Sequence, residues 1–265
     1  MRSLCFVLLI TGISLDANAV GRLADVSIVD RASGEELTTH FYKGEYWVVG
    51  TPGARYAISI HNTLGERLLA VTTVDGVNVL SGETASWSQT GYVFWPRQHY
   101  EVTGWRKSDA EVAAFEFTAL PNSYAVRTGR PENVGVVGLA LFRERVAPES
   151  ESYAQAFKLQ QVPSSAPALS APAPGSGEFL GGALSAGVLQ SLGTGHGERE
   201  YSHIRHVEFE RLSSTPEEVI RIRYDRLENL IAMGVVQHLQ RPLARPDPFP
   251  DSPLARYVPD PPDSR

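Results

Sequence analysis

Short segments in which apolar and polar residues alternate follow one another through the first half of the chain. Residues 24–30 and 55–61 alternate in this way, and residues 68–74 form a more continuous apolar segment. Because successive side chains of a strand point to opposite faces, this period predicts strands with one buried face. Asp75-Gly76 directly follows the third segment and indicates a hairpin, since a tight turn needs the positive φ that glycine adopts without strain.

Three further segments, residues 100–105, 112–118 and 134–142, are also expected to be strands. Turn residues separate these segments at intervals of about ten, and no long helical period lies between them. This spacing is typical of an antiparallel β-sandwich, either immunoglobulin-like or jelly-roll-like. We therefore predict a mainly β protein with a sandwich domain over residues 20–147.

The second half of the chain changes in composition. Residues 148–177 are rich in proline, alanine and serine, which predicts a linker, and the proline-rich residues 241–265 predict a disordered tail. Between them, residues 178–240 are expected to form a small α+β segment. So short a segment cannot bury enough apolar surface alone, so we expect it to dock on the sandwich.

Within this segment we expect strands at residues 207–212 and 220–224, followed by a helix with Asp225 as its N-cap. The alternative is one helix over residues 216–233. The glycine-rich residues 193–197 lack the strand, lysine and helix of a phosphate-binding loop, and we interpret them as a hinge.

The N-terminus has the pattern of a cleavable secretory signal peptide over residues 1–19. Arg2 precedes a mostly apolar run over residues 4–15, and Ala17-Asn18-Ala19 offers small residues before a cut. The run is too short to span a membrane, which takes about 20 residues. We expect a periplasmic or secreted mature chain that begins at Val20.

The charge, the cysteine content and the apolar segments of the chain exclude some classes of partner and some kinds of stabilising bond. The formal net charge is −6, which argues against nucleic acid as a partner. The single cysteine, Cys5, leaves with the signal peptide, so no disulfide is expected. No later apolar stretch is long enough for a transmembrane segment. We expect no cofactor, and a partner that is a protein or a carbohydrate.

Aromatic and charged residues gather between residues 83 and 106, and they are our candidates for ligand binding. Aromatic faces edged by polar groups suit sugars or peptides, because the faces stack and the edges orient. The alternative is that the rings fill or cap the sandwich core. The candidates are Glu83, Trp87, Tyr92, Trp95, Trp105 and Arg106.

Sequence patterns for catalysis or metal binding are weaker than the pattern of aromatic and charged residues described above. Asp75 and Glu83 could act as paired carboxylates in a hydrolase of envelope polysaccharide or peptide, which is our alternative function. His203 and His206 would point to opposite faces of a strand, and His196 adds no recognisable zinc spacing. Residues 183–187 match a nucleophile elbow only loosely. We therefore predict no metal site and no catalytic residue, and favour a non-enzymatic binding module.

A further set of short motifs lies at residues 81–85, 104–108, 117–121, 123–125, 127–131, 134–138, 142–144, 192–197 and 222–225. In these motifs the chain resembles a family of exported proteobacterial proteins of unknown function. The resemblance covers most of the mature chain and implies no activity, cofactor or catalytic residue.

Overall fold

The computed structural model describes residues 19–145 and 191–237. The expected signal peptide before Ala19, the expected linker and tail, and the elbow-like residues 183–187 lie outside these residues.

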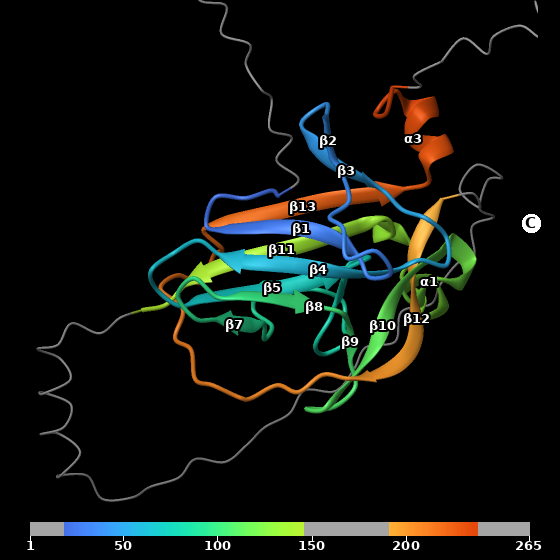
Figure 1. The fold of residues 1–265 in the computed structure, drawn as a ribbon. Coiled ribbons are helices and arrows are strands. Elements are labelled where there is room, and N and C mark those ends of the chain that lie inside the picture. The colour runs from blue at the N-terminus through green and yellow to red at the C-terminus, as the bar shows by residue number, and fades with distance from the viewer. Residues whose placement is uncertain (1–18, 146–190, 238–265) are drawn as a thin grey trace, which may run out of the picture.

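The described chain is mainly β and forms two sheets in a sandwich-like arrangement (Figure 1). The first sheet has the order β1 (Ala24–Asp30), β4 (Arg55–Asn62), β10 (Glu111–Ala119) and β12 (Leu192–Tyr201), with β8 (His99–Val102) paired to β4 and β9 (Gly104–Arg106) paired to β10. The second has the order β2 (Thr39–Tyr42), β3 (Glu45–Val49), β13 (Glu218–Asp225), β11 (Val136–Arg143), β5 (Leu68–Val74) and β6 (Val77–Asn78), with β7 (Tyr92–Phe94) paired to β5. Two short helices, α1 (Tyr124–Arg127) and α3 (Leu227–Met233), complete the main elements.

The predicted mainly β class is confirmed, and the alternating segments of the first half of the chain lie in strands, with residues 100–105 divided between β8 and β9. Residues 24–30 and 68–74 coincide with β1 and β5. The hairpin predicted at Asp75-Gly76 joins β5 to β6, with φ of 52° at Asp75 and 72° at Gly76.

The main hydrophobic core lies between the two sheets, because each strand turns its apolar face inward. It is built from large buried side chains of both sheets, among them Ile28, Ile58, Ile60, Phe115, Phe117, Leu68, Leu139 and Leu141. A smaller cluster of Leu69, Val71, Ala140 and Phe142 covers the other face of β5 and β11.

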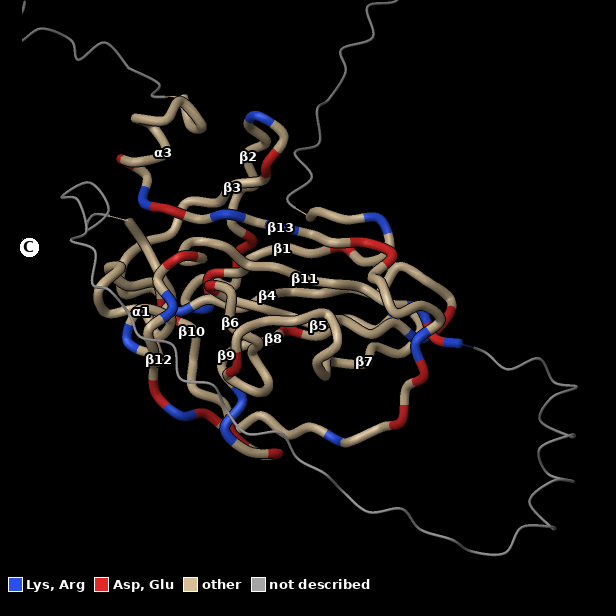
Figure 2. Tube along the Cα trace, turned by 180° about the vertical axis from the view of Figure 1, so that it is seen from behind, with Lys and Arg blue, Asp and Glu red and all other residues tan. Residues whose placement is uncertain are grey.

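The strands of the C-terminal segment join both sheets. β12 pairs with β10 along the first sheet. β13 lies between β3 and β11, parallel to the former and antiparallel to the latter (Figure 1, Figure 2). The segment therefore docks by strand pairing, and one of its strands is internal to a sheet.

The glycine hinge expected at residues 193–197 is wrong, because these residues belong to β12. A Cβ on Gly193 would lie 2.5 Å from Cβ of Ser123, and one on Gly197 would lie 2.9 Å from the carbonyl oxygen of Ala114. Glycine is therefore placed here by the close approach of β12 to its neighbours.

The strand expected at residues 207–212 is also wrong. There Arg211 forms only an isolated bridge with Glu144. The strand-then-helix interpretation that follows is confirmed by β13 and α3, against the single helix. Asp225 ends β13 instead of capping α3, whose N-cap position is Arg226.

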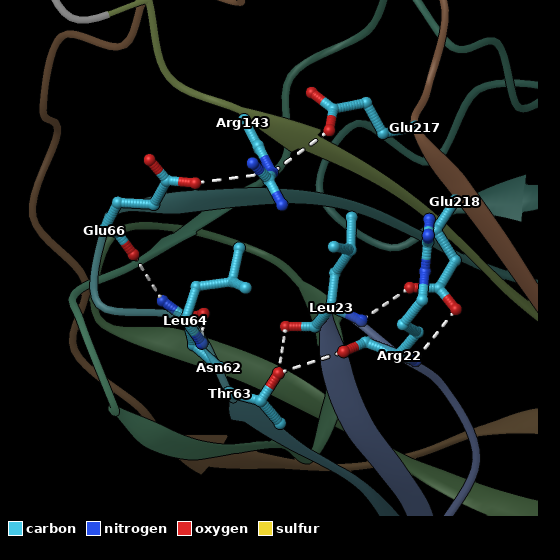
Figure 3. A network of polar contacts seen from close by, with 9 residues as sticks. All are labelled: Arg22, Leu23, Asn62, Thr63, Leu64, Glu66, Arg143, Glu217 and Glu218. Carbon is cyan, nitrogen blue, oxygen red and sulfur yellow. Dashed lines mark hydrogen bonds and ion pairs between the residues drawn. The ribbon is translucent and has the colours of Figure 1, made fainter.

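A polar network ties the first described residues to β13 (Figure 3). The Glu218 carboxylate accepts hydrogen bonds from the backbone N–H of Arg22 at 2.9 Å and of Leu23 at 2.7 Å. The Thr63 hydroxyl donates to the carbonyl oxygens of the same two residues. The start of β1 is thus tied to β13 and to the residue that follows β4.

Candidate ligand-binding pocket

A pocket of about 750 Å³ opens beside β7, β8 and β9. β7 belongs to the second sheet and β8 to the first, so the turn between them crosses from one sheet to the other. The third wall is the irregular connection after β12, residues 202–211, which we call the strap. In Figure 1 it is the orange segment that passes beneath β8 and β7.

Four aromatic residues line the pocket: Tyr92, Phe94, Trp95 and Tyr100, of which Phe94 is only 1% exposed. The rings of Tyr92 and Tyr100 lie 6.0 Å apart between centroids. Trp95 is 56% exposed, and its backbone N–H donates to Oε1 of Gln98 at 2.8 Å. The turn therefore presents an indole with a free surface beside two partly buried phenols.

Arg106 on β9 joins this aromatic wall to the strap. Its Nη2 donates to the Tyr92 hydroxyl at 3.1 Å and to Oγ of Ser202 at 3.2 Å, and its Nη1 donates to the Ser202 carbonyl oxygen at 2.5 Å. Its Nε is buried without a hydrogen-bond partner among the described residues. Burial raises the pKa of Tyr92, although the Arg106 guanidinium opposes this shift.

Further titratable groups stand at the rim, on the turn after β9 and on the strap. The lining includes Lys107, Asp109, His203, Arg205 and His206. Nε2 of His206 lies 3.0 Å from Oδ1 of Asp109, and this pair connects the middle of the strap to the turn after β9. Four of these five rim groups are basic.

The strap is held at its far end on the outer face of the second sheet. Phe209 packs against the cluster of Leu69, Val71, Ala140 and Phe142. The Arg211 guanidinium lies 4.2 Å from the centroid of the Phe142 ring and donates to the carbonyl oxygens of Trp87 and Gln89.

Arg67 links that far end back to the pocket. Its guanidinium lies 5.3 Å from the ring centroid of Trp95 and 5.8 Å from that of Phe209, and it is paired with Glu144. The exposed indole and the far end of the strap therefore share one cation.

The six predicted binding residues do not all lie in one place. Tyr92, Trp95 and Arg106 line the pocket. Glu83 and Trp87 are exposed but lie outside its lining, and Glu83 accepts a hydrogen bond from Gln89.

Trp105 does not belong to an exposed patch, since it is only 2% exposed. It packs edge-on against Phe115 and donates from Nε1 to the Gly195 carbonyl oxygen at 3.2 Å. For this residue the core-filling alternative is correct.

The strap residues were missed as site residues. Residues 203–206 read His-Ile-Arg-His, a basic run that signals a charged surface but not its neighbours. They lie about a hundred positions from Arg106 in the chain, and only the pairing of β12 with β10 brings them to the pocket.

The Asp75 carboxylate is fully buried and forms part of a polar network between the sheets. Its oxygens accept hydrogen bonds from the Tyr224 hydroxyl at 2.5 Å, the Thr194 N–H at 2.8 Å and the Gly135 N–H at 2.9 Å. The Thr194 hydroxyl in turn lies 2.7 Å from the hydroxyls of both Tyr56 and Tyr224.

Burial raises the pKa of Asp75 to about 6, although the Tyr224 hydroxyl and the backbone donors favour the charged form. The carboxylate is 0% exposed, so it cannot reach a substrate, whereas Glu83 is exposed. The two carboxylates of the hydrolase alternative therefore do not face one another across a cleft.

Within residues 19–145 and 191–237, no group of three or more histidine, cysteine or acidic side chains is placed to hold a metal ion. In the same part of the chain, no helix is long and apolar enough to cross a membrane.

Comparison of the chain with protein-family models, with curated proteins and with solved structures finds no match.

Proposed function

We propose that this protein is an exported, non-enzymatic binding module that takes a carbohydrate ligand in the pocket between β7, β8, β9 and the strap. The observation that carries the proposal is the lining itself, in which an exposed indole and two phenols stand beside a rim of hydrogen-bonding and charged groups.

This combination matches what a sugar needs. The C–H face of a pyranose ring stacks on an aromatic ring, and its hydroxyls need polar groups around the edge. A volume of about 750 Å³ lies within the usual range for small-ligand sites. The fixed position of Trp95, held by Gln98 and Arg67, reduces the entropy lost on binding.

A hydrolase is supported less well by the same lining. A glycosidase uses two carboxylates that flank the scissile bond. The pocket is lined by one, Asp109, and that carboxylate is engaged by His206.

The test is a titration of the chain from Val20 onward with a panel of oligosaccharides, followed by tryptophan fluorescence and calorimetry. We expect at least one to bind and Trp95→Ala to weaken it about tenfold, since truncation of a central aromatic residue at a binding surface typically costs more than about 1 kcal/mol. Trp87→Ala is the matched control, because Trp87 is 52% exposed but lies outside the lining. Equal losses in both variants, or no binding to any sugar, would contradict the proposal.

A further inference from the structure

The charged groups of the pocket are unbalanced in sign. Arg106, Lys107 and Arg205 contribute three full positive charges to the lining, and Asp109 contributes the one negative charge. The chain as a whole carries a net charge of −6, so this excess is opposite to that of the whole protein. Figure 2 shows basic positions beside β9 and on the strap, at the edge where the pocket lies.

Arg106 is the cation placed deepest in this wall. Its guanidinium is partly buried, and its acceptors are neutral: the Tyr92 hydroxyl and oxygens of Ser202 and Ser108. No carboxylate of the described residues forms a salt bridge with it. A partly buried cation without a counter-ion is costly, and an anion that enters the pocket offsets that cost.

Lys107 experiences the same lack of negative charge. Its pKa is lowered, first by partial burial and then by the positive charge of Arg199. Its Nζ lies 5.8 Å from the centroid of the Tyr124 ring, again a neutral neighbour. Arg205 is exposed at the rim and adds a third cation.

We infer that the pocket selects an acidic saccharide, with a sugar ring on Trp95 and a carboxylate directed to Arg205 at the rim and attracted by the positive charge of Arg106. The inference rests on the proposed carbohydrate-binding function and adds the charge of the ligand. A sugar ring that carries a carboxylate fits a pocket that has an aromatic wall and a basic edge. The Nη atoms of Arg106 already donate to Tyr92, Ser202 and Ser108, so Arg106 acts through its charge. The exposed guanidinium of Arg205 is suited to the carboxylate because its planar fork matches two carboxylate oxygens.

The test compares acidic trisaccharides of galacturonate, glucuronate and mannuronate with their methyl esters, which keep the ring and remove the charge. An acidic peptide is included as a ligand of another class. We expect at least one acid to bind ~tenfold more tightly than its ester at low ionic strength, as expected for the loss of a charge-assisted contact. The difference should shrink at high salt, where exposed charges are screened.

Variants at the rim locate the effect. Arg205→Gln should weaken the acid about threefold and leave the ester unchanged, since an exposed ion pair contributes up to ~1 kcal/mol. Arg205→Lys should restore binding, because it restores the charge. Arg221→Gln is the matched control, an exposed arginine that lines a separate hollow beside β2 and β3.

The outcomes distinguish a failure of the preference for acidic sugars from a failure of carbohydrate binding itself. Equal affinity for acids and esters would overturn the inference and leave a neutral-sugar binding module. Binding of the acidic peptide alone, or of none of these ligands, would overturn both.

Discussion

At the scale of single residues, Asp75 carries more of the architecture than its place in a two-residue turn suggests. Its backbone makes the β5–β6 hairpin with positive φ, while its carboxylate accepts hydrogen bonds from β13, β12 and the residue before β11. The raised pKa of about 6 means that the fold binds the proton of Asp75 more tightly than the unfolded chain does. Its contribution to stability is therefore full below about pH 4 and falls by about 3 kcal/mol as the pH rises to about 6.

We predict that Tyr224→Phe destabilises the protein more at pH 7.5 than at pH 5. The Tyr224 hydroxyl donates to the carboxylate and favours its charged form, so its removal raises the pKa of Asp75 further. The variant then loses more stability as the carboxyl ionises, on the order of 1–2 kcal/mol beyond its loss at pH 5. Urea unfolding of both proteins at the two pH values measures this difference.

The matched control is Tyr56→Phe, which removes a buried hydroxyl of the same network. That hydroxyl contacts Thr194 and does not donate to Asp75. Its cost should be nearly the same at both pH values. If Tyr224→Phe costs as much at pH 5 as at pH 7.5, Asp75 does not titrate in this range.

At the scale of elements, the strap is an irregular segment that depends on a few side chains at its two ends. We predict that Phe209→Ala destabilises the protein by about 1–2 kcal/mol, because it uncovers part of the cluster formed by Leu69, Val71, Ala140 and Phe142. It should also weaken ligand binding, since the far end of the strap positions Arg67 against Trp95.

Thermal unfolding and the ligand titration together measure these effects. Val207→Ala is the control on the same strap for thermal unfolding only, because Val207 lines the pocket; it is 44% exposed, so its cost should stay within about 0.5 kcal/mol. A strap that tolerates Phe209→Ala as well as Val207→Ala would not be anchored through Phe209.

Strands with a regular alternation and a marked turn could be predicted from the sequence, as β1, β5 and the Asp75-Gly76 hairpin show. β12 could not, because its glycines have the local signal of a flexible segment. Their actual cause is the close approach of Ser123 and Ala114, which only the tertiary structure contains. The strand predicted at residues 207–212 is wrong for the opposite reason. These residues alternate, but among the described residues they form only one isolated bridge, at Arg211.

In the candidate pocket too, local associations could be predicted from the sequence and long-range ones could not. Tyr92, Trp95 and Arg106 lie within fifteen residues, so their association could be predicted from local sequence. Trp105 has the same aromatic signal, but β9 turns it into the core. The strap wall depends on strand pairing between distant segments, and no local pattern encodes that pairing.

At the scale of the whole molecule, the two described parts of the chain form one structure in which neither part has complete sheets. β13 supplies the strand between β3 and β11, with six paired positions against β11 and four against β3. Without it, the second sheet would split and expose two strand edges, and Ile222 and Tyr224 would leave the core. The strap belongs to the same part of the chain as β13, so the pocket's third wall also depends on residues 191–237.

We therefore predict that residues 20–145 expressed alone do not unfold cooperatively, although their alternating segments are those of a sandwich. Addition of a peptide of residues 191–237 should restore cooperative unfolding, because β12 and β13 pair with strands of the first part at many positions and bury Leu192, Ile220 and Ile222. The complementary experiment places a protease site between residues 146 and 190 of the full chain. After cleavage, the two pieces should elute together in gel filtration and keep their β-rich circular dichroism, since the paired strands remain in place.

The control for complementation is the peptide of residues 191–237 that carries Ile222→Asp, because a charge at this fully buried position should prevent complementation. A fragment of residues 20–145 that folds alone, or cleaved pieces that separate while each stays folded, would show that β13 is dispensable for the sandwich.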